Sequence, residues 1–313
     1  MISLVTGADG FVGGYLVRLL RAEGRPVLAT YRTGAAVPTG FTTEESAGVT
    51  WIPLDLGDGD SVRQLAEHAV DAVYHLAAVA SGQAAREDPG EAWAVNAGGT
   101  ARLLEALASA PAGRQPRVLV VSSGEVYGSA DHPLRETDPL VPRSPYAASK
   151  VGAEVAALEV MRRTGLPVII ARPFPHTGPG QTERYVVPAF AARLRAAAQS
   201  GASSVRTGNL SPVRDFLDVR DVVRAYTALV AAGQAGEVYN VASGTGISLE
   251  QLFQRLAAII GVTARPEPDP ALQRPADLPY LVGDASRLAS ATGWRGTIPL
   301  TQTLQDLVDA QAD

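Results

Sequence analysis

The first half of the chain alternates short β-branched runs with longer helical segments, and this alternation restricts the fold more than any other feature. A repeated strand–helix order covers both faces of a parallel sheet with helices, so we predict a doubly wound α/β fold of the Rossmann type. Ligands of such sheets bind beyond the carboxyl ends of the strands. The expected strands are 2–6, 26–31, 49–54, 72–76, 117–122 and 166–171, and the expected helices are 11–23, 61–69, 92–109 and 146–163.

A glycine-rich segment, TGADGFVG, begins at Thr6, where the first expected strand ends and the first expected helix is about to start. Its three glycines permit a tight turn, close approach of the backbone to a pyrophosphate, and close helix–strand packing. The helix N-terminus then offers N–H groups and partial positive charge to the phosphates. An ordinary glycine-rich turn is the alternative, but the position between strand and helix favours dinucleotide binding. The expected contacts are Gly7, Asp9, Gly10, Phe11, Val12 and Gly13.

The end of the second expected strand indicates which dinucleotide binds. Folds that prefer NAD place an acidic residue about 20 positions past the first glycines, where it binds the ribose 2′-hydroxyl. Here no acid occurs before Glu44, and Arg32 can pair with a 2′-phosphate, aided by Thr30 or Thr33. A solvated surface arginine is the alternative. We predict NADP(H) as the preferred cofactor, with NAD(H) also usable.

A tyrosine and a lysine four residues apart, Tyr146 and Lys150, open the fourth expected helix and share one of its faces. A free phenol has a pKa of about 10, too high for proton exchange at neutral pH. An ammonium group about 4 Å away favours the phenolate by about 4 kcal/mol at an effective dielectric constant of 20. We therefore expect Lys150 to lower the pKa of Tyr146 and make it an acid/base catalyst. A pair on a solvated helix face is the alternative.

Two serines, Ser122 and Ser123, lie at the carboxyl end of the fifth expected strand. Ser123 can hydrogen-bond a reacting oxygen beside Tyr146, or both serines can simply satisfy backbone groups at the strand terminus. The glycine segment, the serines and the Tyr/Lys pair follow one another in the order that an oxidoreductase site of this fold requires.

Beyond Arg172 the regular alternation ends, and prolines and glycines separate shorter elements. Residues 216–242 nevertheless have the pattern of another helix and strand of the main sheet. We therefore predict a dinucleotide-binding domain of residues 1–172, to which 216–242 return. A smaller interleaved α/β lobe of residues 173–215 and 243–313 would bind the substrate.

The chain resembles the extended short-chain dehydrogenase/reductase family, which includes nucleotide-sugar epimerases, dehydratases and reductases. The resemblance covers essentially the whole chain and also rests on LDL at 54–56, HLAA at 75–78, VN at 95–96 and GT at 99–100. It implies that Ser123, Tyr146 and Lys150 form the catalytic set, with Glu125 as a further catalytic residue. The further cofactor contacts that it implies are Asp55, Leu56, Leu76, Ala77, Ala78, Asn96, Tyr146, Lys150 and Pro173.

Within that family, the second half is most similar to the reductases of GDP-4-keto-6-deoxy-mannose. The segments that carry this are HTGPGQ at 176–181, GNL at 208–210, VRDFLDVRD at 213–221, RPAD at 274–277 and TGW at 292–294. GDP-mannose 4,6-dehydratases share much of the pattern but usually carry an extended cofactor-binding insertion, which the sequence lacks. The implied substrate contacts are Ser123, Glu125, His176, Gln181, Asn209, Arg214 and Arg274.

Several of these substrate residues have alternatives. Arg214 and Arg274 are suited to clamping a diphosphate, or they form salt bridges with Asp215 and Asp277. Pro175 stands where the family usually has a substrate-contacting asparagine, so a neighbour such as His176 takes that contact or sugar recognition differs. Glu125 abstracts a proton in dehydratases, yet reductases carry a glutamate there too.

Composition excludes other classes of protein. The chain has no cysteine, which excludes disulfides, thiolate metal sites and cysteine nucleophiles. Its net charge of −5 argues against a nucleic-acid surface, and its four histidines lack metal-ligand spacing, so no metal is expected. No apolar run approaches the ~18 residues of a membrane span, and the strand that follows Met1 leaves no room for a secretion signal. We expect a soluble, cytoplasmic protein.

These features predict reduction of the 4-keto group of a nucleotide-activated 6-deoxy sugar, namely GDP-4-keto-6-deoxy-D-mannose to GDP-D-rhamnose. A GDP-mannose 4,6-dehydratase, another nucleotide-sugar epimerase or dehydratase, and a non-catalytic dinucleotide sensor are the alternatives. The resemblance also implies a homodimer that pairs through helices 92–109 and 146–163.

Overall fold

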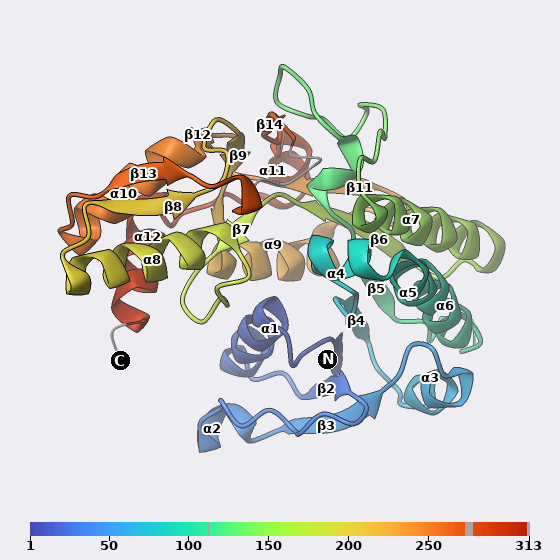
Figure 1. Cartoon of the computed structure of the whole chain (residues 1–313). Coiled ribbons are helices and arrows are strands. Elements are labelled where there is room, and N and C mark those ends of the chain that lie inside the picture. The colour runs from blue at the N-terminus through green and yellow to red at the C-terminus, as the bar shows by residue number, and fades with distance from the viewer. Residues whose placement is uncertain (112, 273–277, 312–313) are drawn as a thin grey trace.

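A computed structural model describes residues 1–111, 113–272 and 278–311 of the chain. Its centre is a parallel sheet of seven strands, which confirms the predicted Rossmann-type fold (Figure 1). The β1–β4 and β1–β2 pairs lie at its middle, and the sheet order is β11 (Val238–Val241), β6 (Val168–Pro173), β5 (Arg117–Val121), β4 (Ala72–His75), β1 (Ser3–Thr6), β2 (Val27–Arg32) and β3 (Val49–Leu54).

Helices cover both faces of this sheet, as its buried strands require. One face packs against α1 (Phe11–Ala22), α9 (Val219–Ala232) and α11 (Ser286–Thr292). The other packs against α3 (Gly59–Ala66), α6 (Thr100–Ala108) and α7 (Pro145–Thr164). Successive side chains of β1 point to opposite faces of the sheet. Val5 packs in the core on the face covered by α1, α9 and α11, and Leu4 packs in the core on the face covered by α3, α6 and α7. The expected helix and strand within 216–242 are therefore confirmed as α9 and β11.

A second lobe lies to one side of the sheet, at the upper left of Figure 1. Its core joins α8, α10 and α12, with the Phe190 and Phe253 rings 5.6 Å apart. Leu288 of α11 packs instead into the core of the main sheet, and the exact division into domains stays a prediction. The elements of this part are β7 (His176–Thr177), α8 (Val186–Ser200), β8 (Ser204–Thr207), β9 (Val213–Asp215), β10 (Leu217–Asp218), β12 (Gly246–Ser248), α10 (Leu249–Ile260), β13 (Arg265–Pro268), η3 (Pro270–Leu272), β14 (Tyr280–Leu281) and α12 (Leu300–Ala310).

The helix expected over 92–109 is confirmed, but it begins earlier, at Pro89, and contains a π-helical turn. The chain forms α5 (Pro89–Trp93), a π-helical turn η1 (Ala94–Gly99) and then α6. This turn lies against α7, where Gly152 leaves no room for a side chain, since a Cβ there would be 2.5 Å from the Trp93 ring. The remaining short helices are α2 (Thr43–Ser46), α4 (Gly82–Glu87) and η2 (Gly124–Tyr127).

Among the residues that the structure describes, none of the helices combines the length and apolar character needed to cross a membrane.

Candidate active site

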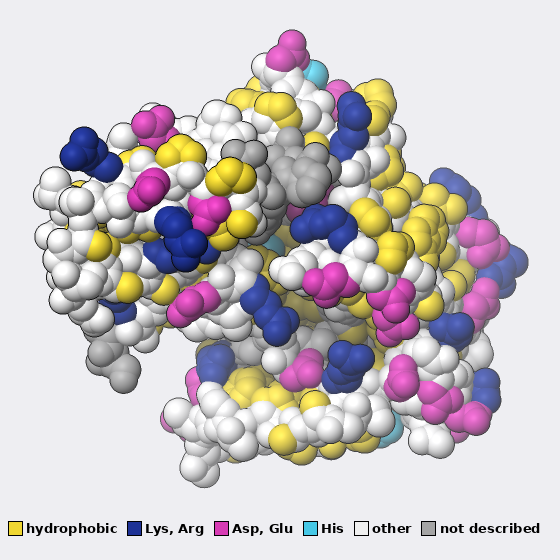
Figure 2. Space-filling model, in the orientation of Figure 1, with side chains coloured by type: hydrophobic (Ala, Val, Ile, Leu, Met, Phe, Trp, Pro, Cys, Tyr) yellow, Lys and Arg dark blue, Asp and Glu magenta, His cyan; other side chains and the backbone are white. Residues whose placement is uncertain are grey.

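A cavity of about 1480 Å³ lies between the carboxyl edge of the sheet and the second lobe. Figure 2 shows the surface hollowed between these two parts of the molecule. Most of the predicted cofactor residues line the cavity: Gly7, Asp9, Gly10, Phe11, Val12, Gly13, Arg32, Asp55, Leu56, Leu76, Ala77, Ala78, Tyr146 and Pro173. Of the predicted substrate residues, Ser123, Glu125, His176, Gln181, Asn209 and Arg214 line it too, and Arg274 lies outside the described residues.

The glycine turn between β1 and α1 is packed too tightly for side chains. Gly7 has φ of +69°, and a Cβ on it would lie 2.8 Å from the backbone nitrogen of Ala77. A Cβ on Gly13 would lie 2.1 Å from the Gly7 carbonyl oxygen. Gly10 is the N-cap of α1 and makes no side-chain cap hydrogen bond, so within the part of the chain that the structure describes the first N–H groups of this helix are not capped by a side chain. This turn therefore fits the pyrophosphate of a dinucleotide.

The turn is also fixed against β2. The backbone N–H of Gly7 donates to Thr30 Oγ1 at 3.2 Å, and the N–H of Arg32 donates to Asp9 Oδ2 at 3.0 Å. The Asp9 carboxylate thus ties the glycine turn to the backbone of β2, a contact that the sequence did not reveal. The exposed Arg32 side chain lines the cavity at the end of β2, where the sequence placed it.

A buried histidine connects the glycine turn to the segment after β4. The Thr100 hydroxyl donates to the Asn96 carbonyl, so it accepts from His75 Nε2, 3.0 Å away. His75 Nδ1 then accepts from the Thr6 hydroxyl at 2.8 Å, and Thr6 Oγ1 accepts from the N–H of Ala77 at 3.2 Å. Burial, with the Lys150 charge as a second cause, lowers the pKa of His75 to about 3. This histidine is therefore a neutral structural link.

Asn96 is buried and does not line the cavity. Its side-chain oxygen accepts from the N–H of Val79 at 2.8 Å, and its amide nitrogen donates to Ser149 Oγ at 2.8 Å. Asn96 thereby ties the cavity-lining loop at Val79 to α7. Its direct contact with a cofactor stays a prediction.

Tyr146 lies in the first turn of α7. Ser144 caps that helix by accepting from the N–H of Ala147 at 3.1 Å. Burial raises the pKa of the Tyr146 phenol and the Glu125 charge raises it further, while a hydrogen bond with Ser123 acts in the opposite direction. The expected lowering of this pKa by Lys150 is therefore wrong, because desolvation dominates. A phenol with a raised pKa keeps its proton at neutral pH, and the acid/base role of Tyr146 stays a prediction.

Lys150 is buried and does not line the cavity. Its ammonium group donates to the Val121 carbonyl at 2.8 Å, at the end of β5. Burial lowers the pKa of Lys150 to about 8, and the Glu154 charge acts in the opposite direction. Glu154 is itself held by a buried ion pair, accepting from Arg172 at 2.9 and 2.6 Å.

Ser123 and Glu125 follow the end of β5. Ser123 begins the short helix η2 and accepts from the N–H of Glu125 at 3.2 Å. Between them, Gly124 packs on the ring of Phe174, which a Cβ would approach to 3.1 Å. Both flanking side chains line the cavity beside Tyr146.

The second lobe adds polar groups around the other end of the cavity. His176 Nδ1 donates to the Phe174 carbonyl at 3.0 Å, and burial lowers the pKa of His176, so the imidazole is neutral. Gln181 donates to the His176 carbonyl at 3.1 Å. Arg214 donates to the Leu278 carbonyl at 2.6 Å, and Asn209 accepts from the N–H of Ser211 at 3.0 Å. Their contact with a substrate stays a prediction.

Sequence reasoning missed a group of cavity-lining residues at the start of α8. No glycine or catalytic motif marks these positions, and only their place after the segment GPGQ signals a loop. They are Glu183, Arg184, Tyr185 and Arg193.

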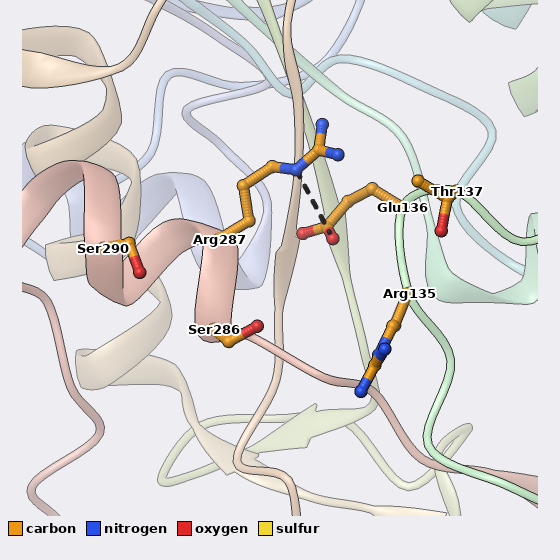
Figure 3. A pocket seen from close by; sticks show the side chains of 6 residues that line it. All are labelled: Arg135, Glu136, Thr137, Ser286, Arg287 and Ser290. Atoms are coloured by element: carbon orange, nitrogen blue, oxygen red, sulfur yellow. Dashed lines mark ion pairs between the residues drawn. The ribbon is translucent and has the colours of Figure 1, made fainter.

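A second cavity of about 450 Å³ lies away from the glycine turn (Figure 3). Its arginines are already paired, since Arg287 contacts Glu136 at 3.7 Å and Glu237 at 2.7 Å, and Arg135 contacts Asp284 at 3.1 Å. This cavity is therefore a surface hollow whose arginines are neutralised by neighbouring carboxylates.

The fold and the larger cavity define a dinucleotide-dependent oxidoreductase of the extended short-chain dehydrogenase/reductase class. Residues 4–307 match the model of the family described as GDP-mannose 4,6 dehydratase, and the chain belongs to that family.

Named relatives span several activities. GDP-6-deoxy-D-mannose reductase of Pseudomonas aeruginosa is 37% identical over 309 residues, which is 97% of this chain and 95% of the relative. The structure of RMD from Pseudomonas aeruginosa complexed with NADPH is 34% identical, covers 99% of this chain and 98% of its own, and has a TM-score of 0.83. The UDP-glucose 4-epimerase of Thermus thermophilus in complex with NAD is 28% identical, with the same two coverages and a TM-score of 0.86.

The glycine turn gives a first prediction. Gly10→Ala should fold normally, since its Cβ would meet only the Gly7 carbonyl at 3.3 Å. It should weaken NADPH binding by about tenfold or more, because the methyl group occupies the path of the pyrophosphate. Gly14→Ala is the matched control, because its Cβ would meet Arg18 at 3.4 Å on the same helix. Fluorescence titration with NADPH measures both, and equal affinities would contradict the phosphate role of the turn.

The buried ammonium group gives a second prediction. The pKa of Lys150 is lower in the folded chain than in the unfolded chain, because burial disfavours the charged ammonium group. The destabilisation by this buried charge is fully present below about pH 8. It declines between about pH 8 and 10.5, where the folded protein has released the proton and the unfolded chain still binds it. Lys150→Met should therefore raise the free energy of unfolding at pH 7 by about 1–3 kcal/mol while impairing turnover. Urea unfolding at pH 7 and pH 9.5 measures this, and a gain that does not shrink at the higher pH would contradict it.

Proposed function

We propose that this enzyme uses NADPH to reduce the 4-keto group of GDP-4-keto-6-deoxy-D-mannose, forming GDP-D-rhamnose. The observation that carries the proposal is that Tyr146 and its hydrogen-bond partner Ser123 line the same cavity as the glycine turn at the start of α1. The 37% identity to a GDP-6-deoxy-D-mannose reductase supports this choice of substrate.

Each residue of the cavity has its own role in this reaction. When bound at the glycine turn, NADPH would supply the hydride that reduces the keto carbon. Ser123 donates a hydrogen bond to the keto oxygen, and Tyr146 gives that oxygen its proton as the alcohol forms. Lys150 holds the end of β5, and therefore Ser123, in place through the Val121 carbonyl. The neutral His176 and the Arg214 guanidinium face the sugar and the diphosphate.

The cofactor preference rests on the end of β2. Arg32 lines the cavity there, and a guanidinium suits a 2′-phosphate. The NADPH complex of the Pseudomonas neighbour supports this preference, and the NAD complex of the Thermus neighbour supports NADH as a slower substitute.

A 4,6-dehydratase is the second candidate, because Glu125 lines the cavity. Elimination needs a carboxylate to remove a proton and a neighbouring acid to protonate the departing hydroxyl. The residue between Ser123 and Glu125 is Gly124, and Phe174 packs against it. Gly124 carries no acid, but the Ser123 and Tyr146 hydroxyls line the same cavity, so Glu125 does not separate the two candidates and the substrate test below decides between them.

We also propose a homodimer formed through α5, η1 and α7. Trp93 and Val155 on this face are 47% and 64% exposed. Figure 2 shows hydrophobic side chains gathered over α7 and its neighbours.

Substrate tests separate the candidates. Purified protein should oxidise NADPH when GDP-4-keto-6-deoxy-mannose is added, with NADH slower, and should leave GDP-mannose alone unchanged. Tyr146→Phe should bind NADPH normally and lose about 10²–10⁴-fold in kcat, because the proton donor is gone. Conversion of GDP-mannose without net NADPH consumption would overturn the reductase assignment.

The dimer has its own test. Val155→Glu places a charge in the apolar face and should shift the protein to monomer in sedimentation velocity measurements. Val141→Glu, at a position that is 47% exposed outside that face, is the control and should leave the mass unchanged. A dimer that persists in Val155→Glu would contradict this interface.

A further inference from the structure

Tyr185 is the N-cap residue of α8 in the second lobe, and it lines the large cavity. Its backbone is fixed, because its N–H donates to the Thr182 carbonyl and its carbonyl accepts from the N–H of Ala189, both at 3.1 Å. Val187 and Phe190 turn into the core of the second lobe. The side chain of Tyr185 stays outside that core and is 40% exposed.

The side chain of Tyr185 lines the same cavity as Ser123, Glu125 and Tyr146. Its side chain does not cap α8. A large aromatic ring with a hydroxyl at its tip is therefore held at the cavity wall without the packing that a structural tyrosine normally has.

Such a group suits a carbohydrate ligand. A phenol ring offers apolar surface to the C–H faces of a sugar, and its hydroxyl both donates and accepts hydrogen bonds. The part of the substrate that reaches Tyr146 is the reacting hexose. Tyr185 enters this cavity from the second lobe, and on this ground we assign it to the hexose.

We propose that Tyr185 is a substrate-positioning residue whose hydroxyl hydrogen-bonds the hexose and holds its keto carbon beside Tyr146 and Ser123. This inference rests on the proposed function, since it takes a nucleotide-linked sugar as the ligand. It assigns sugar selectivity to the second lobe, and cofactor binding and proton transfer to the first.

Tyr185→Phe tests this, because it removes one oxygen and keeps the ring. It should lower kcat/KM for the keto sugar by about 3- to 10-fold, mainly through a higher KM. The affinities for NADPH and for GDP alone should stay unchanged. Tyr280→Phe is the matched control, since Tyr280 in β14 does not line the cavity, and it should behave as wild type.

Calorimetry keeps this test independent of turnover. Wild-type protein should bind GDP-mannose more tightly than GDP, and Tyr185→Phe should lose much of that difference. A wild-type enzyme without keto-sugar turnover would overturn the proposed function but leave this comparison intact. An unchanged difference between GDP-mannose and GDP, or an equal loss of GDP affinity, would overturn the role of Tyr185.

Discussion

The close contact between the β1–α1 turn and the end of β4 is the constraint on which the site depends. The Cα of Gly7 faces the backbone of Ala77, and Gly13 faces the Gly7 carbonyl, at separations that exclude any side chain. This contact brings the N-terminus of α1 to the carboxyl edge of the sheet. β5 and β6 end at the same edge, so the N-terminus of α1 and the side chains of Ser123 and Tyr146 share one cavity.

Desolvation decides the protonation states around that cavity. It keeps His75 and His176 neutral, and it keeps Tyr146 protonated despite the hydrogen bond with Ser123. It also weakens the hold of Lys150 on its proton, which only the Glu154 charge opposes.

The sequence predicted the main sheet, the long helices of the dinucleotide-binding part and the glycine-turn and Ser123/Tyr146 parts of the cavity wall, because these follow from local patterns. Strand–helix alternation and the glycine turn need only neighbouring residues. The π-helical turn at Asn96 was missed, because no local pattern in the sequence marks it; in the fold, the Asn96 side chain bonds Val79 and Ser149, and Ser149 lies far along the chain. The pKa of Tyr146 was predicted with the wrong sign, because spacing gives the distance to Lys150 but not the burial. Tyr185 carries no motif, and only the packing of the second lobe brings it to the cavity.

The central claim is that the dinucleotide cradle and Tyr146 act on one ligand, a nucleotide-linked keto sugar. NADPH deuterated at nicotinamide C4 on the transferred face tests it directly, with the product analysed by NMR and mass spectrometry. Our account predicts that deuterium appears on carbon 4 of the hexose, with one equivalent of NADP⁺ formed per product. Product that lacks deuterium at carbon 4, or deuterium that stays entirely in the cofactor, would contradict it.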